Sequence, residues 1–364
     1  MQATKRMISV EDSEIMYTTK VFLMIMVLFI HINSYFAKGS MQVGDTIYDM
    51  HISDWLHNMT NIISYVISGC AVPGFFFFAG YLLYLKDFKW ADNMKKRIRK
   101  LLIPYVLVNS FWILFYVVVQ KVPVLAQYFT NSDTHVAKWN WLDWVDAYTG
   151  IIHGSPTVYP LWFVRDLFII NIFAVLLKKL VDKAPRLMLV VMLLLCIFDI
   201  KIGGVTGSGI GFFLTGYYFV KYDISLSCVT KVKLIPLTVV YIVLVILTNI
   251  FSGIQFVTTV AGLLFFMKCA YIINQRNKNN FLRRIAPYTY CIFLFHEMNM
   301  RIVQKIVFKL LPQSKVIVVL EYFLIPFCIM GGCIILAILL KQCVPVVYSL
   351  ISGEKYVMRK GCVK

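Results

Sequence analysis

The chain has 364 residues, of which 60% are hydrophobic and 15% are charged. Repeated apolar runs of about 20 residues, separated by short charged segments, exclude a soluble domain and predict an all-α, polytopic membrane protein. The formal net charge of +18 does not indicate nucleic-acid binding, because most of the cations gather in particular segments. The nine cysteines lie in apolar runs, in predicted cytoplasmic segments or near the C-terminus. We therefore expect neither a disulfide framework nor a metal site.

Ten apolar segments are candidates for membrane spans, and the cations alternate between crowded and nearly empty connections. Six segments, which include both ends of the chain, hold 26 of the 36 Lys and Arg residues, whereas loops 37–59 and 121–159 hold only three. Under the positive-inside rule this pattern predicts about ten transmembrane helices with both termini in the cytoplasm. The spans are expected at residues 17–36, 60–84, 101–120, 160–178, 186–200, 205–220, 234–250, 253–273, 287–308 and 316–340.

This map divides the chain into three parts. Residues 1–16 form a cytoplasmic leader, 17–340 a single transmembrane domain, and 341–364 a basic cytoplasmic tail. The first apolar run lacks a convincing small-residue cleavage site, so we interpret it as a retained span and not as a signal peptide. We expect the chain to cross the cell membrane several times, with membrane lipids as partners.

The first span carries an ionisable residue at each end of an unbroken apolar run, Lys20 and His31. Eleven residues at about 100° each make three turns plus roughly 20°, so the two side chains share one helix face, about 16 Å apart along the axis. Ionisable groups at membrane depth are costly and normally face a polar interior or a substrate path. A histidine that merely hydrogen-bonds a neighbouring helix is the alternative, and Lys20 on the same face favours the functional interpretation.

Two later spans also contain ionisable residues. Arg165 and Asp166 lie near the expected outer end of the fourth span, and they predict either a buried ion-pair network or part of a substrate wall. His296 lies about 13 Å into the ninth span, hence near the membrane midplane, and Glu297 follows it. Among the six histidines, we expect only His31 and His296 at membrane depth.

The densest basic segment, residues 85–100, runs directly into the third span. Its last cations are Lys96, Arg97, Arg99 and Lys100, which would stand at the cytoplasmic mouth and could hold phosphates. A basic run beside a span can also mark only topology and contact with anionic lipids. Glycines elsewhere predict close helix packing, at Gly80 and between the fifth and sixth spans, where a tight turn is expected at residues 203–204.

A basic cytoplasmic rim, a Lys–His pair on one helix face and a second histidine at membrane depth together suit acyl transfer from an acyl-coenzyme A. The nucleotide phosphates would stay at Lys20 and the basic segment, while the pantetheine arm extends along the helix toward His31. A neutral imidazole there could deprotonate an acceptor hydroxyl as it attacks the thioester.

Five segments in this order resemble the acyltransferase 3 family of ten-span membrane O-acyltransferases, which mostly acetylate cell-surface glycans. They are Lys20-x10-His31 and residues 73–83, 96–105, 161–167 and 290–296. The resemblance covers nearly the whole membrane domain. It implies that His31 is the catalytic residue and that Lys20 stands where the family has an arginine. The family's Arg-x-x-Arg motif before the third span would match Lys96 with Arg99, or Arg97 with Lys100.

The sequence thus predicts an O-acyltransferase of a bacterial plasma membrane that moves an acyl group, most simply acetyl, to a hydroxyl of a cell-surface or exported glycan. His31 is the expected catalytic residue, and the donor-binding residues are Lys20, Lys96, Arg97, Arg99 and Lys100. His296, Glu297, Arg165 and Asp166 are candidates for supporting roles. Acetyl-coenzyme A is expected as a donor substrate and no cofactor as a permanent ligand. The alternative is a transporter or flippase for an anionic glycolipid or polysaccharide precursor, in which the same cations would bind phosphate.

Overall fold

The structure is a computed structural model that describes residues 8–43, 46–50, 52–130, 134–276, 281–312 and 314–354. Each of the ten predicted spans coincides with helical structure, and six helical stretches are long and apolar enough to cross a membrane. These are α1 (Val10–Phe36), Asp54–Tyr84 with α2 (Asp54–Asn61) and α3 (Ala71–Tyr84), Trp90–Val119 with α4 (Trp90–Arg97) and α5 (Ile103–Val119), Tyr159–Lys183 with α8 (Trp162–Lys183), Ser252–Arg276 with α12 (Gln255–Arg276), and α15 (Lys315–Cys343).

The other four predicted spans correspond to α9 (Pro185–Phe198), α10 (Gly207–Lys221), α11 (Leu234–Ile250) and α14 (Thr289–Leu310). The first three have 14, 15 and 17 residues. At 1.5 Å per residue they are about 21–26 Å long, shorter than a hydrocarbon core of about 30 Å. α14 has 22 residues but carries several charges. The protein is therefore a multi-pass helical membrane protein, while the count of ten spans and the side of the termini stay predictions.

The remaining elements belong to the connections between these helices. They are β1 (Ser40–Val43), β2 (Thr46–Asp49), α6 (Pro123–Phe129), α7 (Trp141–Thr149), α13 (Phe281–Ile285) and α16 (Pro345–Ser352). The antiparallel β1–β2 hairpin was not expected in an all-α chain. Its first strand buries Met41 and Val43 and exposes Gln42 between them. Such alternation over four residues is too short to be recognised in a sequence.

α1 begins at Val10, before the apolar run and inside the predicted leader. The Ser9 hydroxyl caps the helix by accepting a hydrogen bond from the Asp12 amide at 3.0 Å. Asp12 is buried and accepts hydrogen bonds from the Ser225 hydroxyl and the Ser227 amide, at 2.7 and 2.8 Å. Capping and a partnered carboxylate explain why the helix extends beyond the predicted span.

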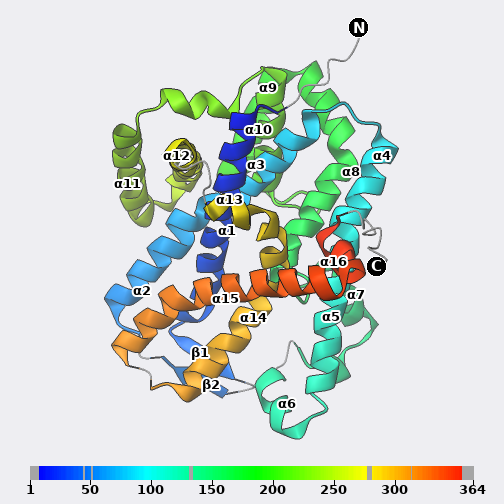
Figure 1. Ribbon diagram of the computed structural model, residues 1–364, viewed down its shortest axis with the longest axis vertical. Helices are drawn as coiled ribbons and strands as arrows, with labels where there is room; N and C mark the ends of the chain where they lie inside the picture. The colour runs from blue at the N-terminus through cyan, green and yellow to red at the C-terminus, as the bar shows by residue number, and fades with distance from the viewer. Residues whose placement is uncertain are drawn as a thin grey trace, which may run out of the picture.

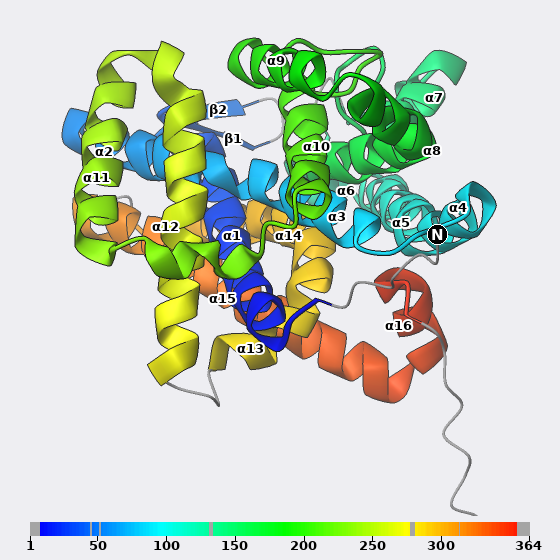
Figure 2. The ribbon, with the colours of Figure 1, turned by 90° about the horizontal axis from the view of Figure 1, so that it is seen from above.

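α1 lies near the middle of the molecule, with α11 and α12 on one side and α4 and α5 on the other (Figures 1 and 2). It packs against α3, α12, α14 and α15. Its buried face includes Val21, Leu23, Leu28 and Ile32. The residues expected to carry the chemistry thus stand on the helix that the others surround.

Glycines let α3, α9 and α10 approach one another closely. A Cβ atom at Gly80 would lie 2.0 Å from the carbonyl oxygen of Phe213, and one at Gly216 would lie 2.4 Å from that of Phe77. On the other side of α10, a Cβ atom at Gly211 would meet the Cys196 sulfur at 2.3 Å. This confirms the close packing predicted at Gly80 and between the fifth and sixth spans. The tight turn at residues 203–204 is also confirmed, because both glycines adopt positive φ.

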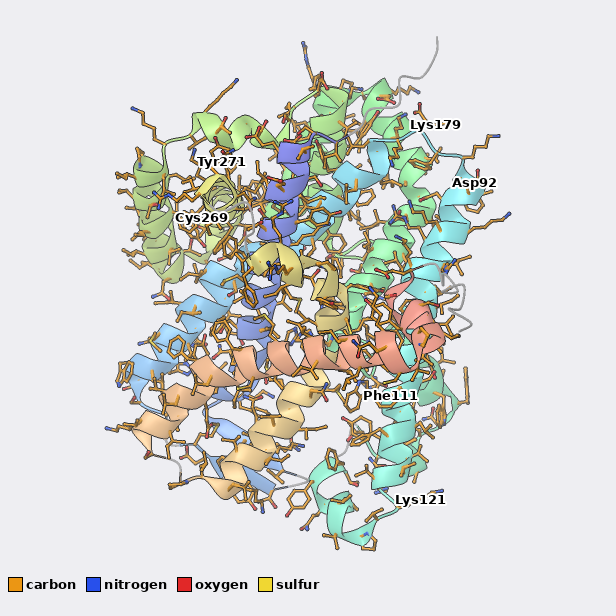
Figure 3. All side chains as sticks on the ribbon, viewed as in Figure 1. Asp92, Phe111, Lys121, Lys179, Cys269 and Tyr271 are labelled. Atoms are coloured by element: carbon orange, nitrogen blue, oxygen red, sulfur yellow. The ribbon has the colours of Figure 1, made fainter. Side chains whose placement is uncertain are left out.

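Figure 3 shows Lys179 and Asp92 toward one end of the molecule and Lys121 at the other. The first two belong to segments assigned to the cytoplasm, and Lys121 belongs to a loop assigned to the exterior. The side of the membrane on which each of these segments lies stays a prediction.

Candidate active site

His31 and His296 meet where α1 packs against α14. Their ring centroids are 4.9 Å apart, with the ring planes at 65°. Tyr159 lies shortly before α8, and its ring centroid is 5.9 Å from that of His31. Three segments far apart in the chain thus bring an aromatic wall and two imidazoles to one place. The two histidines predicted at membrane depth are neighbours.

His296 is held in a defined orientation. It is fully buried, and its Nδ1 lies 2.8 Å from the carbonyl oxygen of Phe293 and 3.1 Å from that of Ile292. Since carbonyl oxygens only accept hydrogen bonds, Nδ1 carries the proton and Nε2 carries the lone pair. Within the described residues, Nε2 has no hydrogen-bond partner. An unpaired buried acceptor is uncommon and is compatible with a chemical role.

Glu297 forms an ion pair with Arg301, one helical turn further along α14. The carboxylate is 3% exposed, whereas the arginine side chain is 44% exposed. Glu297 Oε1 accepts from Arg301 Nε, and Oε2 has no partner among the described residues. The carboxylate, which directly follows His296 in the sequence, therefore holds the guanidinium in place one helical turn further along α14.

Arg165 and Asp166 belong to a different network. The guanidinium donates to Asp166 Oδ1 through Nε at 3.0 Å and Nη2 at 2.9 Å, and through Nη1 to the Thr149 carbonyl oxygen at 2.7 Å. Asp166 Oδ2 accepts from the Thr206 amide at 3.1 Å. These bonds join α8 to the end of α7 and to the start of α10. The pair thus forms an ion-pair network, and Arg165 also lines a cavity of about 650 Å³, so both predicted alternatives stay predictions.

The expected donor-binding cations surround a π-helical turn at residues 98–102. The Lys20 ammonium lies 5.9 Å from the centroids of the Tyr17 and Phe78 rings, and Lys100 is near enough to repel it electrostatically. The Lys100 carbonyl oxygen accepts from the Tyr290 hydroxyl at 2.9 Å. Lys20, within α1, and Lys100, in the π-helical turn, are thus close enough to interact electrostatically. Single π-helical turns inside longer helices are frequent at functional sites.

Arg97 and Arg99 point to other partners. Arg97 donates to the Asn93 side chain at 3.1 Å, one turn back on α4. Arg99 donates to the backbone carbonyl of Glu354 at 2.6 Å. Glu354 comes shortly after α16, a helix that lies in the region predicted to be a tail and packs on α5. Gly353, with φ of +66°, approaches Lys100 so closely that a Cβ atom would lie 2.7 Å from its Cα. Lys96 has no recorded side-chain hydrogen bond among the described residues.

A cavity of about 550 Å³, the loop cavity, opens between the 134–159 segment and α14. Tyr159 and Arg301 both line it, so it lies beside the ring that packs on His31. Its other walls carry aromatic, charged and hydroxyl side chains suited to a polar ligand, including Trp139, Asp143, His153 and Thr157. The cavity provides room for a polar ligand on one side of Tyr159, and the Tyr159 ring also packs on His31.

Asp146 fixes the shape of this loop. Its carboxylate accepts from the Ile152 amide at 2.6 Å, from the His153 amide at 3.1 Å and from His153 Nδ1 at 2.6 Å. Burial raises the pKa of Asp146, but these hydrogen bonds and the His153 ring outweigh it, so the pKa lies below its ordinary value. The ionised form of Asp146 is therefore the form that the folded loop requires.

Sequence reasoning missed Tyr159, Arg301 and Lys305. Ten Lys and Arg residues lie outside the six basic segments, and four of them are Arg301, Lys305, Lys309 and Lys315. These four follow one another at the end of the ninth span that is assigned to the exterior. The positive-inside rule makes cations scarce there, so their clustering was the available signal. Tyr159 carried no signal, because tyrosines are common at membrane interfaces.

The fold and the site together define a multi-pass membrane protein with a histidine pair between α1 and α14, a basic segment before α5 and a polar cavity lined by the 134–159 segment and Arg301. The family model described as "Acyltransferase domain", that of the acyltransferase 3 family, matches residues 18–341. The chain therefore belongs to this acyltransferase family. The match confirms the family resemblance of the five sequence segments.

The chain is also similar to a protein named for polysaccharide biosynthesis. The chain is 26% identical over 165 residues to the succinoglycan biosynthesis protein ExoH of Rhizobium meliloti (strain 1021). The alignment covers 44% of this chain and 43% of that protein. No solved structure matches the chain.

Proposed function

We propose that this membrane acyltransferase transfers an acetyl group from acetyl-coenzyme A to a hydroxyl of a cell-surface or exported glycan. Family membership supports acyl transfer, and the relative named for succinoglycan biosynthesis supports a polysaccharide as acceptor. The observation that carries the proposal is the contact between His31 and His296, next to the Tyr159 wall of the loop cavity.

His31 acts as the general base in this proposal. A neutral imidazole nitrogen takes the proton of the acceptor hydroxyl as its oxygen attacks the carbonyl carbon of the thioester. The new C–O bond forms, the C–S bond breaks, and the resulting imidazolium returns the proton to the thiolate of coenzyme A. The products are the acyl ester and free coenzyme A, so protons and electrons balance.

The arrangement separates donor and acceptor. Lys20, which lies within α1, and Lys100 would hold the donor's phosphates. His31 is about 16 Å further along the axis, on the same face as Lys20. The thioester would reach His31 from the side of Lys20, and the acceptor hydroxyl would approach through the loop cavity. The supporting role of His296 is to present a fixed, uncharged ring against His31.

The test uses the purified protein in nanodiscs with radiolabelled acetyl-coenzyme A and a crude surface-glycan extract. We expect label in the glycan and release of an equal amount of free coenzyme A. A transporter would instead move substrate without an acyl donor. Substrate movement in proteoliposomes without donor, together with no label transfer by folded protein, would contradict the proposal.

A further inference from the structure

A second cavity, the basic cavity, has a volume of about 220 Å³ and lies between the end of α1, the β1–β2 hairpin, α6 and α14. Three cations line it, namely Lys38, Arg301 and Lys305. Among the described residues that line it, none is Asp or Glu. A cavity with this lining favours a negatively charged ligand.

These cations are not accounted for by membrane topology. Arg301, Lys305 and Lys309 are spaced by four residues along α14, so they follow one face of the helix. They stand at the end of the span that the charge pattern assigns to the exterior, where Lys and Arg are otherwise scarce. A ligand with negative charge would explain why cations gather there.

Arg301 has hydrogen-bonding capacity left for such a ligand. Within the described residues, its recorded partner is the Glu297 carboxylate, which takes the Nε proton. Its two terminal nitrogens can then form paired hydrogen bonds to one carboxylate or phosphate. Lys305 is placed beside it, since its ammonium donates to the Tyr128 carbonyl oxygen at 2.9 Å and lies 5.6 Å from the Phe129 ring centroid.

The rest of the lining suits a sugar. Aromatic rings offer flat apolar surfaces to the C–H faces of a saccharide, and hydroxyl and amide groups can hydrogen-bond its hydroxyls. The aromatic residues are Tyr35, Phe115, Tyr116, Tyr128 and Phe129, and the polar ones include Ser34, Ser40, Gln42 and Thr134.

The basic cavity adjoins the loop cavity. Arg301 and Thr134 line both, and the loop cavity is also lined by Tyr159, whose ring packs on His31. A chain of sugars with an acidic group held at Arg301 would continue along the loop cavity toward the histidine pair. The two cavities thus form one path with an anion site at its far end.

We propose that the basic cavity is an acceptor subsite for an anionic saccharide, one that carries a carboxylate or phosphate near the hydroxyl to be acylated. This inference rests on the proposed function and names its acceptor class. Arg301 and Lys305 bind the negative group and position the acceptor, and they take no part in proton transfer.

The experiment measures binding without a donor, so it does not depend on turnover. The full-length protein in nanodiscs is titrated with tetragalacturonate and with neutral maltotetraose. Lys38→Gln, Lys305→Gln and the double variant Glu297→Gln/Arg301→Gln are compared with the wild type. The double variant removes both charges together, so that no buried carboxylate is left unpaired. Lys121→Gln is the matched control, because Lys121 is exposed, lies at the same end of the molecule (Figure 3) and does not line the cavity.

We expect tetragalacturonate to bind more tightly than maltotetraose, and its Kd to rise about tenfold in Lys305→Gln and in the double variant, as the loss of one charge-assisted contact predicts. Lys121→Gln should bind like the wild type, and saturating coenzyme A should not displace the saccharide. Equal binding of the two saccharides, no binding of either, or unchanged affinity in the variants would overturn the inference. Displacement by coenzyme A would also overturn it, because the cavity would then belong to the donor. If acidic saccharide binds as expected but no acyl transfer occurs, the proposed function fails while the subsite stands.

Discussion

The His31–His296 contact and the Arg165–Asp166 pair both place ionisable side chains inside apolar helices, yet they are built differently. Asp166 uses both carboxylate oxygens, and Arg165 reaches backbone carbonyls on either side. His296 is fixed through Nδ1 only, and its Nε2 has no partner among the described residues. Full satisfaction by partners within the protein is typical of a structural tie, whereas an open lone pair next to a cavity is typical of a reactive site. The difference separates two groups that looked alike in the sequence.

Removing the base should have the largest effect on the reaction. We expect His31→Ala to lower the rate of acyl transfer by about 10²–10⁴-fold, the usual contribution of a general base. The thermal unfolding midpoint and the affinity for acetyl-coenzyme A should stay near the wild-type values. Transfer is measured with labelled donor on protein whose folding is verified by size-exclusion chromatography.

Breaking the Arg165–Asp166 pair should lower the stability of the protein and leave the rate of acyl transfer unchanged. Asp166→Ala leaves a buried guanidinium without its carboxylate, which typically costs about 3–5 kcal/mol of stability. We expect little folded protein but an ordinary turnover rate for each folded molecule. The double variant Arg165→Met/Asp166→Leu should recover part of the stability, because it removes both charges. A low turnover rate in well-folded double variant would show that the pair acts in the chemistry.

Substitution of the cations in the basic segment should weaken binding of the donor more than it slows the chemical step. We expect Lys100→Gln and Arg97→Gln to raise the KM for acetyl-coenzyme A by about tenfold, as loss of a charge-assisted phosphate contact predicts, with a nearly unchanged kcat. Lys179→Gln is a suitable control, since Lys179 belongs to another segment assigned to the cytoplasm and lies outside residues 85–100. An unchanged KM in both variants would indicate that these residues only set topology.

The smallest effect is expected at the loop that shapes the cavity. The pKa of Asp146 is lower in the folded protein than in the unfolded chain, so ionised Asp146 stabilises the fold above an unfolded-state pKa of about 3.9. This contribution is lost as the pH falls through the lower, folded-state pKa. We expect Asp146→Asn to reduce the Tm by about 2–4 °C at pH 7 and by less at pH 3. An equal reduction at both pH values would mean that charge plays no part in holding the loop.

The sequence was sufficient to place the long helices, because most predicted spans are largely apolar segments whose length and flanking charges are local features. It also indicated His31 and His296 individually, since ionisable residues stand out in such runs. It could not predict that their rings lie 4.9 Å apart, because this depends on how α1 packs against α14. The cavities could not be predicted from the sequence for the same reason. Their walls combine the end of α1, the 134–159 segment and α14, which are distant in the chain.

Two local features also went unpredicted. Residues 345–352 form α16 and pack on α5, although their position after the last span suggested a simple tail. The side chains of Arg97 and Arg99 diverge, one toward Asn93 and the other toward Glu354, although their spacing suggested a common phosphate site. The packing of α16 and the direction of Arg99 depend on contacts between the 345–354 segment and residues near α5, which leave no local pattern in the sequence.

The most direct measurement compares three purified proteins at equal folded concentration, namely wild type, His31→Ala and Arg165→Met/Asp166→Leu. Each is given labelled acetyl-coenzyme A and surface-glycan extract, and the first turnover is followed by label in the glycan and by free coenzyme A. We predict transfer by the wild type and by the double variant, and none above background by His31→Ala. Transfer by His31→Ala at the wild-type rate would contradict the account, because the histidine pair would then not perform the reaction.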